Sequence, residues 1–301
     1  MKSFETSSEL DLSFLAPVLL VMGKGGVGKT TVAAGLAYAA SSAEAPATLV
    51  EFGDGESGKR ALLGSDRIVE HVVITPEQAL EAGAAPLFGS ALLAKVALGN
   101  FAMKPLLRAA PAIRELAMLE AVRVVAAQRP GRRIVVDMPA TGHGVAWLRV
   151  PRQGRDFLGS GPLFELCDGL ARNLLSQGRA SIVVVTLPEA LVIEETLELC
   201  LALQTETALS VQALVLNRQA GPVAQAALAD ALQWSQKGGA IGAAAQELLT
   251  ILRSREQTRE AQRTALAPLR ASGCRFLSVT ETVEAPLAQR VAAMLAELGE
   301  V

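Results

Sequence analysis

Two lysines stand in a glycine-rich stretch near the start of the chain, GKGGVGKTT, from Gly23 to Thr31. The span from Gly23 to Thr30 satisfies the pattern G-x-x-x-x-G-K-S/T, in which backbone N–H groups and one lysine hold the phosphates of a nucleotide. Glycines let the backbone curl closely around phosphate oxygens, where larger side chains would collide. The stretch therefore predicts a phosphate-binding loop.

Individual residues of the loop have predicted roles. Lys29 is expected to neutralise the β- and γ-phosphates, the Thr30 hydroxyl to coordinate Mg²⁺, and Thr31 to bond the α-phosphate. The start of the following helix adds about half a positive charge. The residues predicted to bind nucleotide here are Gly23, Gly25, Gly26, Val27, Gly28, Lys29, Thr30 and Thr31.

A carboxylate ends a second apolar run, RIVVDM, at residues 133–138. An acid at the end of a buried strand opposite a phosphate loop is where Mg²⁺-bound water is held. Asp137 is therefore predicted on the metal side of the site, acting on Mg²⁺ through water.

The phosphate loop and Asp137 can bind the same nucleotide only if the strands that precede them end at the same edge of a sheet. Short β-branched runs alternate with long alanine- and leucine-rich stretches, which predicts an α/β fold with a mostly parallel sheet and helices on both faces. The predicted strands are 17–22, 47–52, 69–74, 133–138, 181–187, 211–216 and 275–279, and the predicted helices are 29–42, 188–204, 222–236, 243–265 and 285–298.

Two segments, 76–128 and 143–179, lack strand signals. The first carries apolar residues at helical spacing, and together the two predict a helical subdomain inserted into one P-loop ATPase domain of residues 1–301.

The composition argues against two classes of function, nucleic-acid binding through overall charge and spanning of a membrane. Half of the 301 residues are hydrophobic and the net charge is −2, so no overall field draws the chain towards nucleic acid. No run reaches the roughly 20 apolar residues needed to cross a bilayer. The cysteines, Cys167, Cys200 and Cys274, form no C-x-x-C pair, which favours a reducing cytoplasm and buried thiols. The basic run 129–133 is interpreted as a solvated turn before a strand.

Several motifs together point to a known family. GKGGVGKTT resembles the deviant Walker A loop of the SIMIBI class of P-loop NTPases. VVDMPATGHGVAWLRVP, residues 135–151, is similar to the switch II sequence Asp-x-x-Pro-Thr-Gly-His-Thr of the ArsA/Get family, the arsenite-pump and tail-anchored-protein-targeting ATPases. Within it Asp137, Thr141, Gly142 and His143 match, whereas Pro139 and Ala140 are transposed. Agreement extends to TLPEALVIEETLEL (186–199), LVLNR (214–218) and APAIRELAMLEAV (110–122).

The resemblance implies a cytoplasmic, dimeric switch that binds ATP and Mg²⁺ and hydrolyses ATP. Lys24 would reach the nucleotide of the other subunit, the alternative being a solvated loop lysine. Asn217 would read the adenine edge, which suits an amide donor and acceptor. His143 either makes a structural hydrogen bond or takes part in chemistry. A client or partner would bind the helical subdomain, where the apolar residues of 87–107 either line a groove or pack on the sheet.

Switch I departs from the family pattern Asp-Pro-Ala-His-Ser. In LVEFGDGESGKRALLG, residues 49–64, alignment on Ser57 puts Gly53 at the position of the aspartate and Asp54 one residue later. Asp54 is expected to orient the attacking water, and the alternative is a solvated turn acid with slow or absent hydrolysis. The zinc-binding C-x-x-C of the family is also missing, which disfavours a zinc-bridged dimer.

Two other functions stay open. The chain could be a nucleotide-binding regulatory or scaffold subunit that hydrolyses weakly or not at all, paired in a homodimer or with a related chain. A partitioning ATPase acting on membrane or DNA is disfavoured, because the last predicted helix, APLAQRVAAMLAELGEV, has one arginine and two glutamates.

Overall fold

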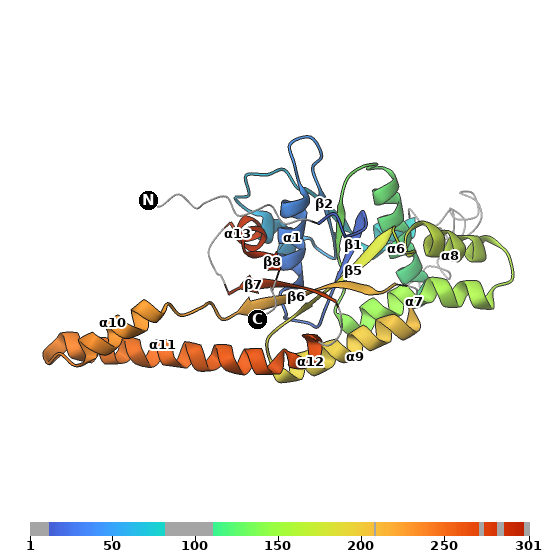
Figure 1. Cartoon of the computed structure of the whole chain (residues 1–301). Helices are drawn as coiled ribbons and strands as arrows, with labels where there is room; N and C mark the ends of the chain where they lie inside the picture. The colour runs from blue at the N-terminus through green and yellow to red at the C-terminus, as the bar shows by residue number, and fades with distance from the viewer. Residues whose placement is uncertain (1–11, 82–110, 208, 271–273, 282–285, 298–301) are drawn as a thin grey trace.

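The computed structural model describes residues 12–81, 111–207, 209–270, 274–281 and 286–297 (Figure 1). Within them lies an eight-stranded sheet of order β3-β2-β4-β1-β5-β6-β7-β8. Seven strands are parallel and β8 is antiparallel to β7. The strands are β1 (Val18–Met22), β2 (Thr48–Phe52), β3 (Glu70–Ile74), β4 (Ile134–Asp137), β5 (Ala180–Thr186), β6 (Val211–Gln219), β7 (Arg275–Thr280) and β8 (Ala296–Glu297). All seven predicted strands are present, and the predicted α/β fold class is confirmed.

Helices cover both faces of the sheet, as predicted. Successive strand residues point to opposite faces, so Leu19 and Val21 pack on one side while Leu20 and Met22 pack on the other. The first face is covered by α1 (Lys29–Ala40), α2 (Glu56–Leu62) and α13 (Leu287–Met294). The second face is covered by α6 (Pro111–Ala127), α7 (Thr141–Phe157), α8 (Pro162–Asn173) and α9 (Ala190–Glu206).

Two elements differ from the sequence prediction. The helix α2 was not predicted, because its seven residues are too few to show a helical repeat. The predicted helix 285–298 is shorter, since α13 ends at Met294 and the chain then pairs with β7 as β8. Pairing at the sheet edge supplies the backbone hydrogen bonds that another helical turn would have made.

A long helical hairpin extends away from the sheet (Figure 1). It consists of α10 (Gln225–Ser235) and α11 (Gly239–Ala265, 27 residues), which pack along each other, and α12 (Ala267–Arg270) leads back to β7. The hairpin exposes the large apolar side chains of Leu232, Trp234, Ile241, Leu248 and Ile251.

The helices α6, α7 and α8 pack against one another within the predicted segments 76–128 and 143–179. The whole of 87–107, whose apolar residues either line a groove or pack on the sheet, lies outside the described residues. The division into one domain and an inserted subdomain therefore stays a prediction. Among the described residues, no helix combines the length and the apolarity needed to span a bilayer.

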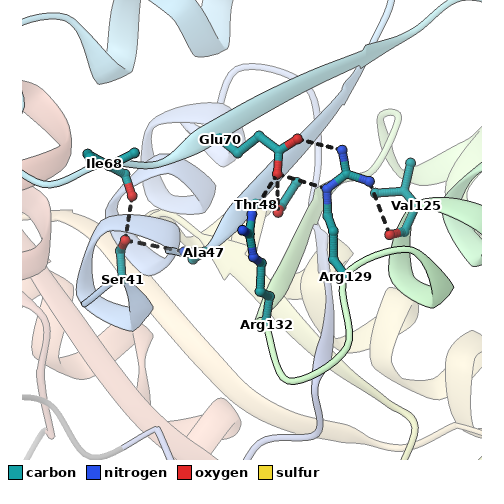
Figure 2. Close-up of polar contacts among 8 residues, drawn as sticks. All are labelled: Ser41, Ala47, Thr48, Ile68, Glu70, Val125, Arg129 and Arg132. Carbon is teal, nitrogen blue, oxygen red and sulfur yellow. Dashed lines mark hydrogen bonds and ion pairs between the residues drawn. The ribbon is translucent and has the colours of Figure 1, made fainter. Parts of the chain in front are cut away.

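The basic run 129–133 is not the solvated turn that the sequence suggested. Arg129 donates two hydrogen bonds to the Glu70 carboxylate of β3, and Arg132 donates a third at 3.0 Å (Figure 2). The hydrogen bond from Arg129 holds the pKa of Glu70 below its ordinary value. Arg133 donates to main-chain carbonyls that precede β1, those of Leu12, Leu15 and Ala16. The run therefore ties the edge strand and the start of the chain to the turn before β4.

The three cysteines are free thiols. Cys167 is buried as expected, while Cys200 and Cys274 are half-buried. Burial raises the pKa of Cys200 to about 11, which keeps this thiol protonated and unreactive at neutral pH. In the described part of the chain, no three His, Cys, Asp or Glu side chains gather as a metal site would require.

Candidate nucleotide-binding site

The loop 23–28 joins β1 to α1 and depends on glycine at two positions. A Cβ on Gly23 would lie 2.4 Å from the carbonyl oxygen of Val185, and one on Gly28 would lie 2.4 Å from Asn217 Nδ2. Gly28 has a left-handed backbone with φ 87° and caps α1. By contrast, a Cβ on Gly25 would meet nothing within 4 Å. The loop is thus held tightly against β5 and β6, while its Gly25 side faces open space.

The loop and the first turn of α1 line a cavity of about 350 Å³. This volume is within the range of small-molecule sites. The first backbone N–H groups of α1 have no partner within the helix, which favours an anion at this position. The lining residues are Gly26, Gly28, Lys29, Thr30, Thr31, Ser57, Arg60, Ala61 and Leu287.

Thr30 and Asp137 meet at this end of the sheet. The Thr30 hydroxyl donates a hydrogen bond of 2.5 Å to Asp137 Oδ2, while Asp137 Oδ1 is buried and has no partner among the described residues. Burial raises the pKa of Asp137 to about 6, although the hydrogen bond from Thr30 and the charge of Lys29 act in the opposite direction. The structure therefore brings the two predicted metal-side residues together.

Mg²⁺ fits this pair. The ion prefers oxygen ligands and retains several waters, and the site offers one hydroxyl and one carboxylate oxygen that lacks a partner. Thr30 would bind the ion directly and Asp137 would bind it through water. The ion would supply positive charge next to the phosphate oxygens.

The two lysines of the loop have different partners. Lys29 Nζ donates to the carbonyl oxygen of Lys24 at 3.1 Å, and burial lowers the pKa of Lys29 while Asp137 opposes this effect. Lys24 Nζ lies 2.5 Å from Glu195 Oε1 of α9. Lys24 is thus neither a freely solvated lysine nor in contact with its own phosphate cavity, but forms an ion pair within the same chain.

Asp54 is exposed and accepts a hydrogen bond of 3.0 Å from the backbone N–H of Glu56. This contact is a local turn that starts α2. Asp54 is not among the residues that line the cavity. Its role as the water-orienting group stays a prediction.

Three cavity residues come from α2 and were not predicted as site residues from the sequence: Ser57, Arg60 and Ala61. Arg60 makes no ion pair with a described residue, and its guanidinium adds a second cation to the cavity that holds Lys29. Nothing in the local sequence marks Arg60, because its position depends on how α2 packs beside α1.

A buried acid anchors α2. Glu51, in β2, accepts a hydrogen bond of 2.8 Å from the backbone N–H of Gly58 and lies 3.0 Å from His71 Nε2. Gly58 allows this approach, since a Cβ there would lie 2.4 Å from Glu51 Oε2. A sequence signal for Glu51 did exist, namely an acid inside the continuous apolar strand TLVEF.

Asn217 is buried and holds the loop. Its Nδ2 donates to the carbonyl oxygen of Val27 at 2.8 Å, and its Oδ1 accepts from the backbone N–H of Arg218. Arg218 has a φ of 55°, a left-handed conformation that non-glycine residues seldom adopt. The predicted contact of Asn217 with adenine stays a prediction. The side chain of His143 lies outside the described residues.

Comparison with known proteins agrees with this geometry. A model of the CobQ/CobB/MinD/ParA nucleotide-binding domain matches residues 18–269. The chain is also 28% identical over 200 residues to ATPase BagA of Mycobacterium tuberculosis (strain H37Rv) and to an ATPase-named protein, Mb3704, of Mycobacterium bovis. Each match covers 60% of this chain and 58% of the relative, so the chain spans less than two thirds of the length of these relatives.

Proposed function

This chain belongs to the family of CobQ/CobB/MinD/ParA nucleotide-binding domains, and on that premise we propose that it is a Mg²⁺-dependent ATPase that acts as a dimeric switch. One observation carries the proposal: the Thr30–Asp137 pair lies beside Lys29 at the end of a glycine loop. A hydroxyl, a carboxylate and a lysine in this arrangement suit Mg²⁺ and the phosphates of a nucleotide.

In the proposed reaction, the N–H groups of the loop and Lys29 bind the β- and γ-phosphates. A water attacks the γ-phosphorus in line, the bond to the β–γ bridging oxygen breaks, and ADP and phosphate leave. Asp54 would orient this water once the switch I loop moves. Gly53 and Gly55, which both have positive φ, flank Asp54 and permit such a movement.

Dimer closure is proposed to use Lys24. Its ion pair with Glu195 is partly exposed, with 43% of the Lys24 side chain accessible, and such pairs contribute little free energy. The phosphates of a nucleotide in a second subunit can therefore compete for Lys24. The partner subunit is a second copy or a related chain. Membership of the ArsA/Get branch and binding of a client belong to this proposal, and the exposed apolar residues of the α10–α11 hairpin support partner binding.

Light scattering after size exclusion tests the switch. Wild type and Lys24→Ala are each measured with ADP and with a non-hydrolysable ATP analogue. Wild type is expected to double its mass only with the ATP analogue, and Lys24→Ala is expected to stay monomeric while still binding nucleotide. A mass that stays constant in every condition would remove the cross-subunit role of Lys24.

A second candidate is a nucleotide-binding scaffold that does not hydrolyse ATP. The observation in its favour is that Asp54 is exposed and accepts a hydrogen bond from the backbone N–H of Glu56 in the turn before α2, away from the cavity lining. A single-turnover ATPase assay separates the candidates. Equal rates for wild type and Asp54→Ala, with ATP bound by both, would favour the scaffold.

A further inference from the structure

A second cavity, of about 410 Å³, lies away from the nucleotide site. Its walls come from the second half of α7, the end of α8, the segment before β5 and the segment before β6. In a parallel sheet these segments lie at the edge opposite the one where the phosphate loop follows β1. The cavity is therefore separate from the phosphate site and does not belong to the proposed hydrolysis.

The floor of this cavity is apolar. Leu148, Leu175 and Leu209 are buried side chains that line it, and Pro151 and Ala171 add further apolar surface. A cavity of about 410 Å³ with an apolar floor can hold an apolar molecule of moderate size and shield it from water.

The rim is basic. Arg152 and Arg155 line the cavity, and none of the ten lining residues is acidic. Arg152 makes no ion pair with a described residue. The ion pair of Arg155 is long, with 3.9 Å between its Nε and Oδ1 of the exposed Asp156. Two further acids on the neighbouring helices have arginine partners outside the cavity, since Glu206 accepts from Arg149 and Asp168 pairs with Arg172 at 3.0 Å. Positive charge at this rim is therefore available to a ligand.

One face of a single helix presents both features. In α7, Leu148, Pro151, Arg152 and Arg155 have the spacing i, i+3, i+4 and i+7, which places them on one side of the helix. Pro151 lies inside the helix and lacks the N–H that would bond the carbonyl of Trp147, so the wall is less rigid at this point. An apolar floor and a cationic rim are thus built into one helical surface.

We propose that this cavity binds an amphipathic anion, a molecule with an apolar body and one carboxylate or similar anionic group. The body would contact the leucine floor, and the anionic group would accept hydrogen bonds from Arg152 and Arg155. Guanidinium groups suit this role because they donate in a fork that matches carboxylate geometry. Ser176 and Gln177 on the lining supply further polar contacts.

Titration calorimetry with decanoate, kept below its micelle concentration, tests the site in the full chain. Saturable binding of one decanoate per chain is expected, with decanol, the neutral molecule of equal length, binding at least about tenfold more weakly. The double variant Arg152→Gln/Arg155→Gln is expected to lose about tenfold in affinity for decanoate. Arg253→Gln, on the exposed surface of α11, is the matched control and should leave the affinity unchanged.

A cavity-filling variant tests the proposed binding site independently of the arginines. Ala171→Phe places a ring where the body of the ligand would lie and should abolish binding, while thermal unfolding and nucleotide binding report that the chain is intact. If this variant does not fold, the arginine variant still decides the outcome. Absence of saturable decanoate binding, or equal affinity of wild type and the double variant, would overturn the proposal.

Discussion

Lys24 and Glu195 join the phosphate loop to α9 through an ion pair with 2.5 Å between Nζ and Oε1. The second oxygen of Glu195, Oε2, is buried and has no partner among the described residues. Glu195 therefore holds Lys24 within the same chain, in competition with the cross-subunit contact that we propose for Lys24.

Removing this restraint is expected to favour the dimer. Glu195→Gln keeps the shape of the side chain but removes its charge, so Lys24 is released for phosphates in a second subunit. The ATP-dependent dimer fraction at a fixed protein concentration, measured by light scattering, should rise severalfold. Glu194→Gln, on the exposed side of α9, is the control. An unchanged dimer fraction in Glu195→Gln would mean that the ion pair does not oppose closure.

Arg60 is expected to contribute to nucleotide affinity. Arg60→Gln removes a cation from the phosphate cavity and should weaken binding of a magnesium nucleotide by about tenfold. Calorimetry or a fluorescent nucleotide measures this. Lys59→Gln is a matched control, because Lys59 is 72% exposed and faces Glu56 at 3.7 Å. Equal losses in both variants would show a general effect of surface charge.

The ionised carboxylate of Asp137 is expected to lower the free energy of unfolding when no Mg²⁺ is bound. Its pKa of about 6 in the folded state lies above the ordinary value of 3.8, so the folded chain binds this proton more tightly than the unfolded chain. Free energy of unfolding is therefore lost as the pH rises from about 4 through about 6.

The variant Asp137→Asn makes this testable. Without Mg²⁺ or nucleotide, it should be more stable than wild type at pH 8 by on the order of 3 kcal/mol, and the difference should become small near pH 4. Urea unfolding at several pH values gives the measurement. The same variant should lose ATP hydrolysis. Lower stability than wild type at pH 8 would show that the ionised carboxylate is favoured in the fold.

The ion pairs of Glu70 with Arg129 and Arg132 are expected to stabilise the edge strand β3 modestly. Glu70→Gln removes the acceptor charge shared by Arg129 and Arg132, and because Glu70 is 35% exposed the cost should be only about 1 kcal/mol. The lowered pKa of Glu70 means that its contribution is present at neutral pH and is lost as the pH falls through that pKa. Urea unfolding of Glu70→Gln and of exposed Glu77→Gln, at neutral and acidic pH, measures the effect. A difference that persists at low pH would point to packing instead of charge.

The sequence predicted the sheet well, because strands buried on both faces have continuous apolar runs that need no knowledge of their neighbours. Gly23, Lys29 and Thr30 follow from local spacing, and Asp137 follows from its place at the end of a strand. Their meeting in space is a consequence of the parallel sheet, which brings the ends of β1 and β4 to one edge.

Tertiary contacts were beyond the reach of the sequence. Glu195 lies 171 residues from Lys24, and no local pattern connects them. Arg60 depends on the packing of α2, a helix too short to show a repeat. The last residues of the chain favoured helix locally, but pairing with β7 at the sheet edge outweighed that preference from Ala296 to Glu297.

The α10–α11 hairpin leaves the sheet after β6 and returns at β7, and these two strands pair directly with each other. The length of the hairpin is therefore set by how α10 and α11 pack along each other, and not by the register of the sheet. At 1.5 Å per residue, the 27 residues of α11 span about 40 Å. Because of this length, a tilt of a few degrees at the base of the hairpin would displace its far end by several ångströms.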